Sequence, residues 1–287
     1  MKLAINYPPQ AEALAAQGAI DFNLFKCPPS WDFVVPQYAP GLHTRAGAAR
    51  PIYLHFPLHA GNNSLRTTDW GQIEEALAQT EPPFVNVHLQ AAVKDFPQVA
   101  AMTTAPEDRN RIAEVLIRDV LLVTDRFGPE RVIVENVPYR GPEGGRLAPC
   151  VDPDVIRRVV EETGRELLLD LAHARLTCLA LGLDARKYVA RLPVARLREL
   201  HVTGAQSDGQ RLRDSMPMGE EDWDLVAWAT RRIRDGHWAR PWALALEYGG
   251  VGPNLAWRSE ASVIADHLPR LKGLMAVASS PGSGRGF

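Results

Sequence analysis

The stretch Leu167-Leu-Leu-Asp-Leu-Ala-His173 joins a short apolar run to a carboxylate and places a histidine three residues later. A strand that is buried on both faces is a continuous apolar run. Asp170 therefore stands where such a strand would reach solvent, and His173 stands where the next turn would fold back over the same opening. The chain repeats this arrangement several times, each time ending an apolar run with a residue that can bind a metal ion.

Two kinds of segment alternate along the chain and predict its fold. Apolar runs typical of strands occur at 2–6, 20–26, 52–56, 84–89, 132–137, 167–171, 197–202 and 242–247. Stretches with the apolar spacing of helices occur at 9–17, 69–79, 106–127, 152–163, 174–192, 220–235 and 259–271. This alternation predicts an α/β fold, a (β/α)8 TIM barrel. An open doubly wound sheet is the alternative, but no Gly-rich phosphate-binding fingerprint follows any strand.

We expect a single barrel domain over residues 1–277, because no linker interrupts the pattern, and a disordered Gly/Ser-rich tail over 278–287. The formal net charge of −2 argues against nucleic acid as a partner. No apolar run approaches the roughly 20 residues of a membrane span. The three cysteines are widely spaced and fit neither a disulfide framework nor a cysteine zinc site. We therefore predict a cytoplasmic protein.

Six consecutive strand ends carry a histidine or a carboxylate directly after apolar residues. In a TIM barrel these ends line one pocket. Three buried carboxylates need compensation, and Lys26 is the one cation at an equivalent position. A divalent transition metal, zinc, manganese or iron, would provide it, at one or two ions per chain. The predicted ligands are His55, His88, Glu135, Asp170, His201 and Glu247.

Other titratable residues fit ordinary structural roles better. His59 follows a predicted strand in a loop, where exposure is the expectation. Glu199 stands at a strand's start and Asp119 on a helix face, and solvation explains both.

At these residues the chain resembles the xylose-isomerase-like TIM-barrel superfamily, which includes ketose 3-epimerases, endonuclease IV and iron-dependent barrels that modify cysteines in peptide natural products. The resemblance covers roughly residues 2–271. In the epimerases, one metal is held by residues matching Glu135, Asp170, His201 and Glu247. In endonuclease IV and the peptide-modifying barrels, residues matching His55 and His88 join Glu135 at a further metal. A third metal there uses residues matching His173, Asp214 and a later histidine, but here Arg213-Asp214-Ser-Met-Pro217 supplies no histidine.

The resemblance implies as first hypothesis a metal-dependent sugar or sugar-phosphate isomerase or epimerase with a small-molecule substrate. Glu135 or Glu247 would move the proton next to a metal-polarised carbonyl, and His173 would orient a hydroxyl. One alternative is a dinuclear iron or zinc enzyme, either a peptide- or thiol-modifying oxidase or a phosphoesterase. Another is a non-catalytic metal-binding barrel. Candidate substrate contacts are Tyr139, Arg140, Arg211, Tyr248 and Arg258.

Overall fold

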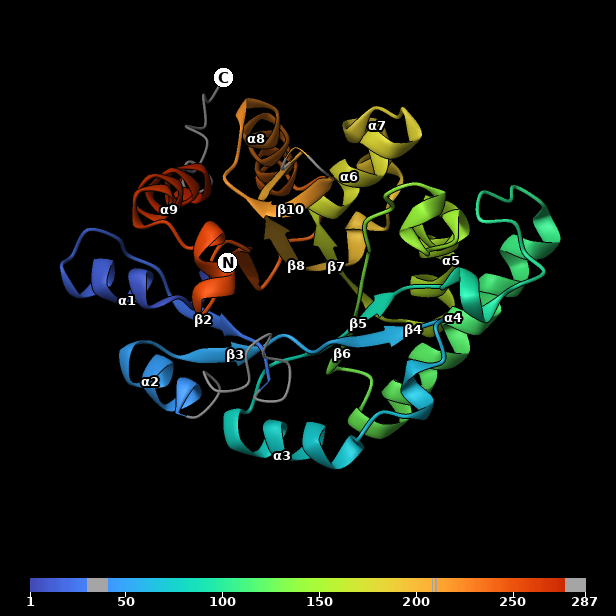
Figure 1. Cartoon of the computed structure of the whole chain (residues 1–287), viewed down its shortest axis with the longest axis horizontal. Coiled ribbons are helices and arrows are strands. Elements are labelled where there is room, and N and C mark those ends of the chain that lie inside the picture. Colours follow the sequence, from blue (N-terminus) through green and yellow to red (C-terminus); the bar gives the residue numbers. More distant parts are fainter. Residues whose placement is uncertain (30–40, 208, 210, 277–287) are drawn as a thin grey trace, which may run out of the picture.

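The computed structural model describes residues 1–29, 41–207, 209 and 211–276. The predicted tail, 278–287, lies outside the described residues. Nine parallel strands form one curled sheet in the order β3-β2-β1-β11-β8-β7-β6-β5-β4 (Figure 1). Their bounds are β1 Lys2–Asn6, β2 Leu24–Cys27, β3 Ile52–Leu54, β4 Leu58–Ala60, β5 Val85–Leu89, β6 Val132–Glu135, β7 Glu166–Asp170, β8 Leu197–Val202 and β11 Ala243–Leu246.

The two end strands of this order, β3 and β4, are consecutive pieces of one stretch of chain. The predicted TIM-barrel fold is therefore confirmed, with its third strand broken at residues 55–57. Pro57 has no amide hydrogen to donate to a ladder. At the break, the Asn86 side chain forms the hydrogen bonds with the Phe56 backbone that a neighbouring strand would otherwise form. Its Oδ1 accepts from Phe56 N at 2.6 Å, and its Nδ2 donates to Phe56 O at 3.1 Å.

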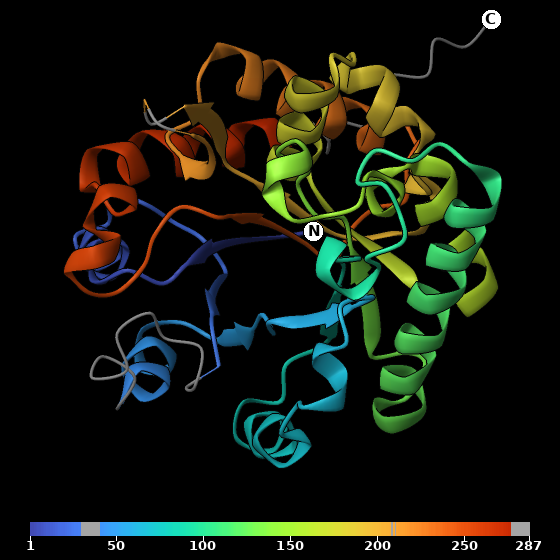
Figure 2. The same cartoon turned by 45° about the vertical axis from the view of Figure 1, so that its right-hand side comes forward.

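Helices surround the sheet (Figures 1 and 2). The α-helices are α1 Pro9–Ala16, α2 Leu42–Ala49, α3 Trp70–Thr80, α4 Pro106–Phe127, α5 Pro153–Thr163, α6 Leu171–Leu181, α7 Ala185–Arg191, α8 Glu220–Arg234 and α9 Ala261–Ala276. The helix predicted at 174–192 is two helices, because Gly182 ends α6 with φ +67°. Helix α2 lies outside the helical stretches that the sequence predicts. None of the helices in the described residues could cross a membrane.

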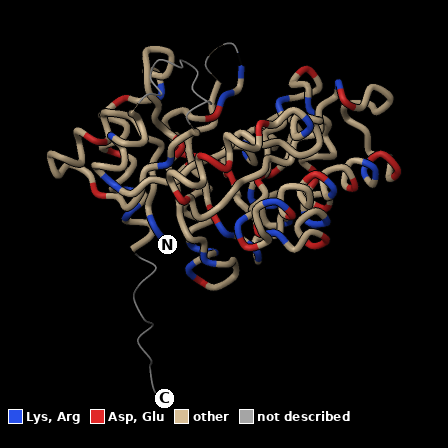
Figure 3. Tube along the Cα trace, turned by 90° about the horizontal axis from the view of Figure 1, so that it is seen from below, with Lys and Arg blue, Asp and Glu red and all other residues tan. Residues whose placement is uncertain are grey.

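Short elements complete the chain around the barrel. A two-stranded antiparallel ribbon, β9 Gly204–Ser207 and β10 Leu212–Met216, follows β8. The 3₁₀ turns are η2 Ser64–Arg66, η3 Val93–Asp95, η4 Pro142–Gly144, η5 Ala148–Val151, η6 Val194–Arg196 and η7 Pro253–Arg258. Lys and Arg residues are interspersed with Asp and Glu along the trace (Figure 3).

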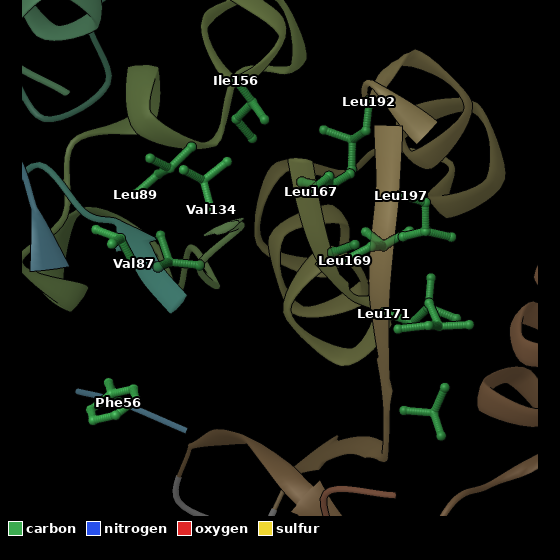
Figure 4. Packing of buried hydrophobic residues seen from close by; sticks show 14 of the residues in the cluster. Phe56, Val87, Leu89, Val134, Ile156, Leu167, Leu169, Leu171, Leu192 and Leu197 are labelled. Atoms are coloured by element: carbon green, nitrogen blue, oxygen red, sulfur yellow. The ribbon is translucent and has the colours of Figure 1, made fainter. Parts of the chain in front are cut away.

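Alternation along each strand separates core residues from site residues. Val132 and Val134 of β6 belong to the large core between sheet and helices, which also holds Leu167 and Leu169 (Figure 4). Ile133 belongs to a separate apolar cluster. Since successive side chains point to opposite faces, Ile133 faces the barrel interior, and Glu135 does so two residues later. On the other strands, too, an inward-facing residue comes two positions before each candidate ligand. These pairs are Tyr53 and His55, Asn86 and His88, Leu168 and Asp170, Glu199 and His201, and Ala245 and Glu247.

Candidate metal centre

The predicted ligands meet at the mouth formed by the C-terminal ends of the strands. Three sets of residues each place one ligand atom per residue within 4.8 Å of the others. Because the sets share Glu135 and His55, they form one continuous polar cluster. The sets are His55, His88 and Glu135; Glu135, Asp170 and His173; and His55, His201 and Glu247.

Strand register places two pairs of these residues side by side. His88 of β5 pairs with Glu135 of β6, and Asp170 of β7 pairs with His201 of β8. Asp170 also begins α6, because its Oδ1 accepts from the backbone N of His173 at 2.7 Å. The capping carboxylate thus fixes the turn that carries His173 back over the mouth.

Two histidines are held by backbone carbonyls. Nδ1 of His88 lies 3.0 Å from Leu58 O, and Nδ1 of His173 lies 2.8 Å from Asn136 O. A carbonyl only accepts, so each Nδ1 carries a proton, and in the neutral imidazole this leaves the lone pair on Nε2. The free Nε2 of His88 lies 3.2 Å from Glu135 Oε2. Burial lowers the pKa of His88, which favours the neutral form that binds metals.

His201 is oriented by a carboxylate that lies deeper inside the barrel. Its Nε2 donates to Glu199 Oε1 at 2.8 Å, and the same oxygen accepts from Tyr53 Oη at 2.7 Å. Nδ1 of His201 is thereby left facing Glu247 Oε1 at 3.1 Å. Hydrogen bonds of this kind set the tautomer of metal-bound histidines. Glu199 is 2% exposed, so the expectation that it is solvated is wrong.

Asn86 contacts the side chains of both His55 and Glu135. Its Nδ2 lies 2.9 Å from His55 Nε2 and 3.2 Å from Glu135 Oε2. His55 Nε2 itself lies 2.9 Å from Glu135 Oε2. Burial, reinforced by the charge of Lys26, lowers the pKa of His55 to about 3. His55 is therefore neutral at physiological pH, as a ligand must be.

The donor set fits a bound cation. Glu135 Oε1, Asp170 Oδ2 and His201 Nδ1 are all buried and have no hydrogen-bond partner among the described residues. Orphaned buried acceptors of this kind are costly in a folded protein. Three of them in one cluster, all potential ligand atoms, fit a metal that completes their coordination.

Lys26 neutralises one carboxylate of the cluster. Its ammonium is buried and forms an ion pair with Glu247. Burial lowers the pKa of Lys26 to about 8, against the attraction of nearby carboxylates. Glu247 is therefore shared between a cation of the chain and the candidate metal centre.

Asp214, the candidate third-site residue, is paired with an arginine. Arg140 Nη2 lies 2.7 Å from Asp214 Oδ2, whereas His173 Nε2 lies 3.6 Å from the same oxygen. No other described histidine pairs with Asp214. A guanidinium thus stands beside the carboxylate that a third metal would need.

The predicted substrate contacts fall into two groups. Tyr139 and Tyr248 are fully buried members of the core, so the structure gives them no surface with which to touch a substrate. Arg258 lines a cavity of about 290 Å³ together with Lys26, His55 and Glu247. Arg140, Arg211 and Arg258 line a neighbouring cavity of about 210 Å³.

Sequence reasoning missed three buried polar residues, Asn86, Glu199 and Asp119, and one half-buried residue, His59. Asn86 and Glu199 each stand two residues before a predicted ligand on the same strand, and that spacing was the signal that could have found them. His59 pairs with His88 in the β4–β5 register and packs against its ring at 5.0 Å, so it is part of the mouth. Asp119 is buried and accepts from Gly61 N at 2.8 Å, a structural role.

Solved structures with a similar fold include sugar epimerases. A D-psicose 3-epimerase, solved with D-fructose present, superposes with a TM-score of 0.56 at 12% identity, covering 97% of this chain and 99% of that one. A D-tagatose 3-epimerase-like protein gives a TM-score of 0.57 at 12% identity, covering 97% and 98%. At this identity the likeness shows the fold alone.

Curated relatives match part of the chain. A UPF0276 protein of Pseudomonas aeruginosa (strain UCBPP-PA14) is 31% identical over 150 residues, which are 50% of this chain and 49% of that protein. A UPF0276 protein of Bordetella parapertussis is 37% identical over 113 residues, 34% of this chain and 39% of that protein. The chain thus spans about half the length, or less, of the curated relatives that it matches.

A family model described as "RiPP precursor modification enzyme MbnB/TglH/ChrH" matches residues 48–248, a span that contains all six predicted strand-end ligands. RiPPs are ribosomally made peptides that are modified after translation, so the description names a peptide precursor as the substrate. The prediction of a sugar or sugar-phosphate isomerase or epimerase with a small-molecule substrate is therefore wrong, and the peptide-modifying alternative is the better one. This chain belongs to the RiPP precursor modification enzyme family MbnB/TglH/ChrH.

Proposed function

We propose that this protein is an iron-dependent enzyme that oxidises a cysteine of a ribosomally made precursor peptide. The observation that carries the proposal is the sharing of Glu135 by two ligand sets, one with His55 and His88 and one with Asp170 and His173. A carboxylate common to two sets supports a pair of bridged ions. An epimerase-type single metal would have no use for His88.

The ligand chemistry supports iron at the first set. Two histidines and one carboxylate, here His55, His88 and Glu135, are the donor combination typical of non-haem iron centres. Iron bound there would supply the one-electron chemistry that dioxygen-dependent oxidation of a thiol requires. The second set that contains Glu135, with Asp170 and His173, would hold the second ion, and His201 lies beside Asp170 in the strand register.

The residues of this chain have separate tasks around the peptide. The cavity lined by His55 and Glu247 is large enough for a cysteine side chain and its neighbours. The Lys26 ammonium in the same wall favours the thiolate form of that cysteine, because a nearby cation lowers a thiol pKa. Glu247, beside Lys26, is placed to accept the thiol proton. Glu199 and Asn86 keep His201 and His55 oriented throughout.

The proposal is tested with protein loaded anaerobically with ⁵⁷Fe. We expect Mössbauer spectra of a coupled iron pair, and Glu135→Gln should abolish the coupling. A library of cysteine-containing peptides, incubated with the loaded protein and dioxygen, should yield products of changed mass, while matched Cys→Ser peptides should not react. Uncoupled single iron ions, or equal activity with zinc in place of iron, would refute the proposal.

A further inference from the structure

Arg258 lies at the end of η7 and lines two adjoining cavities. One is the cavity that also contains His55 and Glu247. The other, next to it, is lined by Arg140, Arg211, Arg213, Asp214 and Trp257 as well. The Arg258 guanidinium therefore stands at the junction between the candidate metal centre and the outer part of the mouth.

Arg258 has no anionic partner within the described residues. Its Nη1 lies 3.3 Å from the neutral Ser215 Oγ, and its buried Nε has no hydrogen-bond partner. Burial also lowers the pKa of Arg258, against the attraction of Asp214. Holding a guanidinium largely out of water without a counter-ion is unfavourable. The nearby carboxylates are already engaged, since Glu247 pairs with Lys26 and Asp214 pairs with Arg140.

Other charged residues lie near Arg258. Among the described residues, Arg140, Arg211, Arg213 and Asp214 line the outer cavity together with Arg258. Arg213 stacks on the Trp257 ring, 5.3 Å from its centroid.

We propose that Arg258 binds a carboxylate of the substrate peptide close to the cysteine that is modified. This inference rests on the proposed function for the identity of the substrate. A planar guanidinium binds a carboxylate through two parallel hydrogen bonds, and Arg258, which lines the cavity without an anionic partner among the described residues, can provide that fork. The carboxylate belongs either to the C-terminus of the peptide or to an Asp or Glu side chain. Because Arg258 and the candidate ligands line one cavity, the carboxylate and the thiol lie within a few residues of each other.

Binding is measured by calorimetry on zinc-loaded protein, so that no turnover interferes. One probe pair is acetyl-Ala-Gly-Cys with a free C-terminus or a C-terminal amide. The other pair is acetyl-Ala-Cys-Asp-Gly-amide and its Asn counterpart. We expect at least one carboxylate peptide to bind tenfold or more tightly than its neutral partner. The pair that shows the preference identifies the source of the carboxylate.

The preference for the carboxylate peptide should disappear in Arg258→Gln. It should persist in the control Arg196→Gln, because Arg196 lies in η6, before the start of β8 and at the opposite end of the barrel. Arg258→Lys should keep part of it, because the charge remains and the fork is lost. Removal of an unpaired buried cation should leave the melting temperature of Arg258→Gln unchanged or raised. If neither carboxylate peptide is preferred, if none binds, or if Arg258→Gln keeps the preference, the inference is wrong.

Cys→Ser versions of the same probes separate this inference from the proposed function. Loss of affinity on Cys→Ser without any carboxylate preference would leave thiol binding intact and overturn the subsite at Arg258. If the carboxylate preference depends on Arg258 but the affinity is unchanged by Cys→Ser, the result would support the subsite and count against thiol chemistry.

Discussion

Glu199 and His201 stand two residues apart on β8, and His201 Nε2 donates to Glu199 Oε1 at 2.8 Å inside the barrel. The pair is sealed from solvent, with 2% and 0% of the two residues exposed. Tyr53 donates to the same carboxylate oxygen from across the barrel. A residue that touches no candidate metal therefore decides which nitrogen of His201 faces the mouth.

Glu199→Gln should weaken metal binding without removing a ligand. The amide can present its NH₂ group to His201 and so favour the wrong tautomer. Loss of such a supporting carboxylate costs about 10–100-fold in metal affinity, which competition with a chelator measures. Glu166→Gln, on the neighbouring strand and half-exposed in an ion pair with Arg198, is the matched control. Equal affinities for the two variants would contradict this role.

Two metal ions per chain are expected, and Asp214 should not hold either of them. Asp170→Asn removes a buried carboxylate with an orphaned oxygen and should lower the metal content by at least one ion. Asp214→Asn should leave the content at two, because Arg140 already pairs with that carboxylate. Elemental analysis of the purified variants measures both. A third ion in the unmodified protein that disappears with Asp214→Asn would overturn this prediction.

His88→Asn should distinguish the ligand set that contains His88 from the other two sets. His88 contributes to the set with His55 and Glu135 and not to the other two. We therefore expect this variant to keep one ion and lose the other, whereas Glu135→Gln should impair both. Metal titration with a spectroscopic probe such as Co²⁺ counts the sites. Equal losses in the two variants would argue against a bridging role for Glu135.

Lys26→Met should destabilise the metal-free protein more than the loaded one. Without the ammonium, Glu247 is left uncompensated in a largely buried position, and breaking a buried ion pair in this way costs about 3 kcal/mol. A bound cation restores the compensation, so metal should raise the melting temperature of the variant more than that of the unmodified protein. Lys272→Met, in an exposed pair with Asp21, should change neither value appreciably. A Lys26→Met protein that gains no extra stabilisation from metal would refute the shared role of Glu247.

The metal-free protein should lose stability as the pH falls from 6.5 toward 4, in part because of His59. Burial lowers the pKa of His59 from 6.5 to about 4. In this window the unfolded chain binds a proton that the folded chain does not, so the free energy of unfolding falls by up to about 1.4 kcal/mol per pH unit for this group. His59→Asn should flatten the dependence in urea titrations at pH 7, 6 and 5. His237→Asn, at an exposed position, is the control, and identical slopes for both variants would contradict the assignment.

The sequence by itself determined the barrel and its ring of candidate ligands. An apolar run that ends in His, Asp or Glu places that residue at a strand end, and parallel strands bring their ends to one mouth. His55, His88, Glu135, Asp170, His201 and Glu247 could therefore be named without coordinates. The choice between sugar and peptide chemistry could not be made this way, because ligand type and order are shared by enzymes of both kinds.

Only the tertiary structure decided which charges are paired and which are not. Lys26 and Glu247 come from opposite ends of the chain, and Arg140 meets Asp214 across 74 residues. Glu199 stands within a strand like many solvated residues, and only the closure of the sheet shows that it faces inward. Ion pairing of this kind depends on the spatial distance between segments that are far apart in the sequence, and the order of residues alone does not give that distance. The same closure leaves Arg258, beside the candidate metal centre, without a counter-ion in the part of the chain that the structure describes.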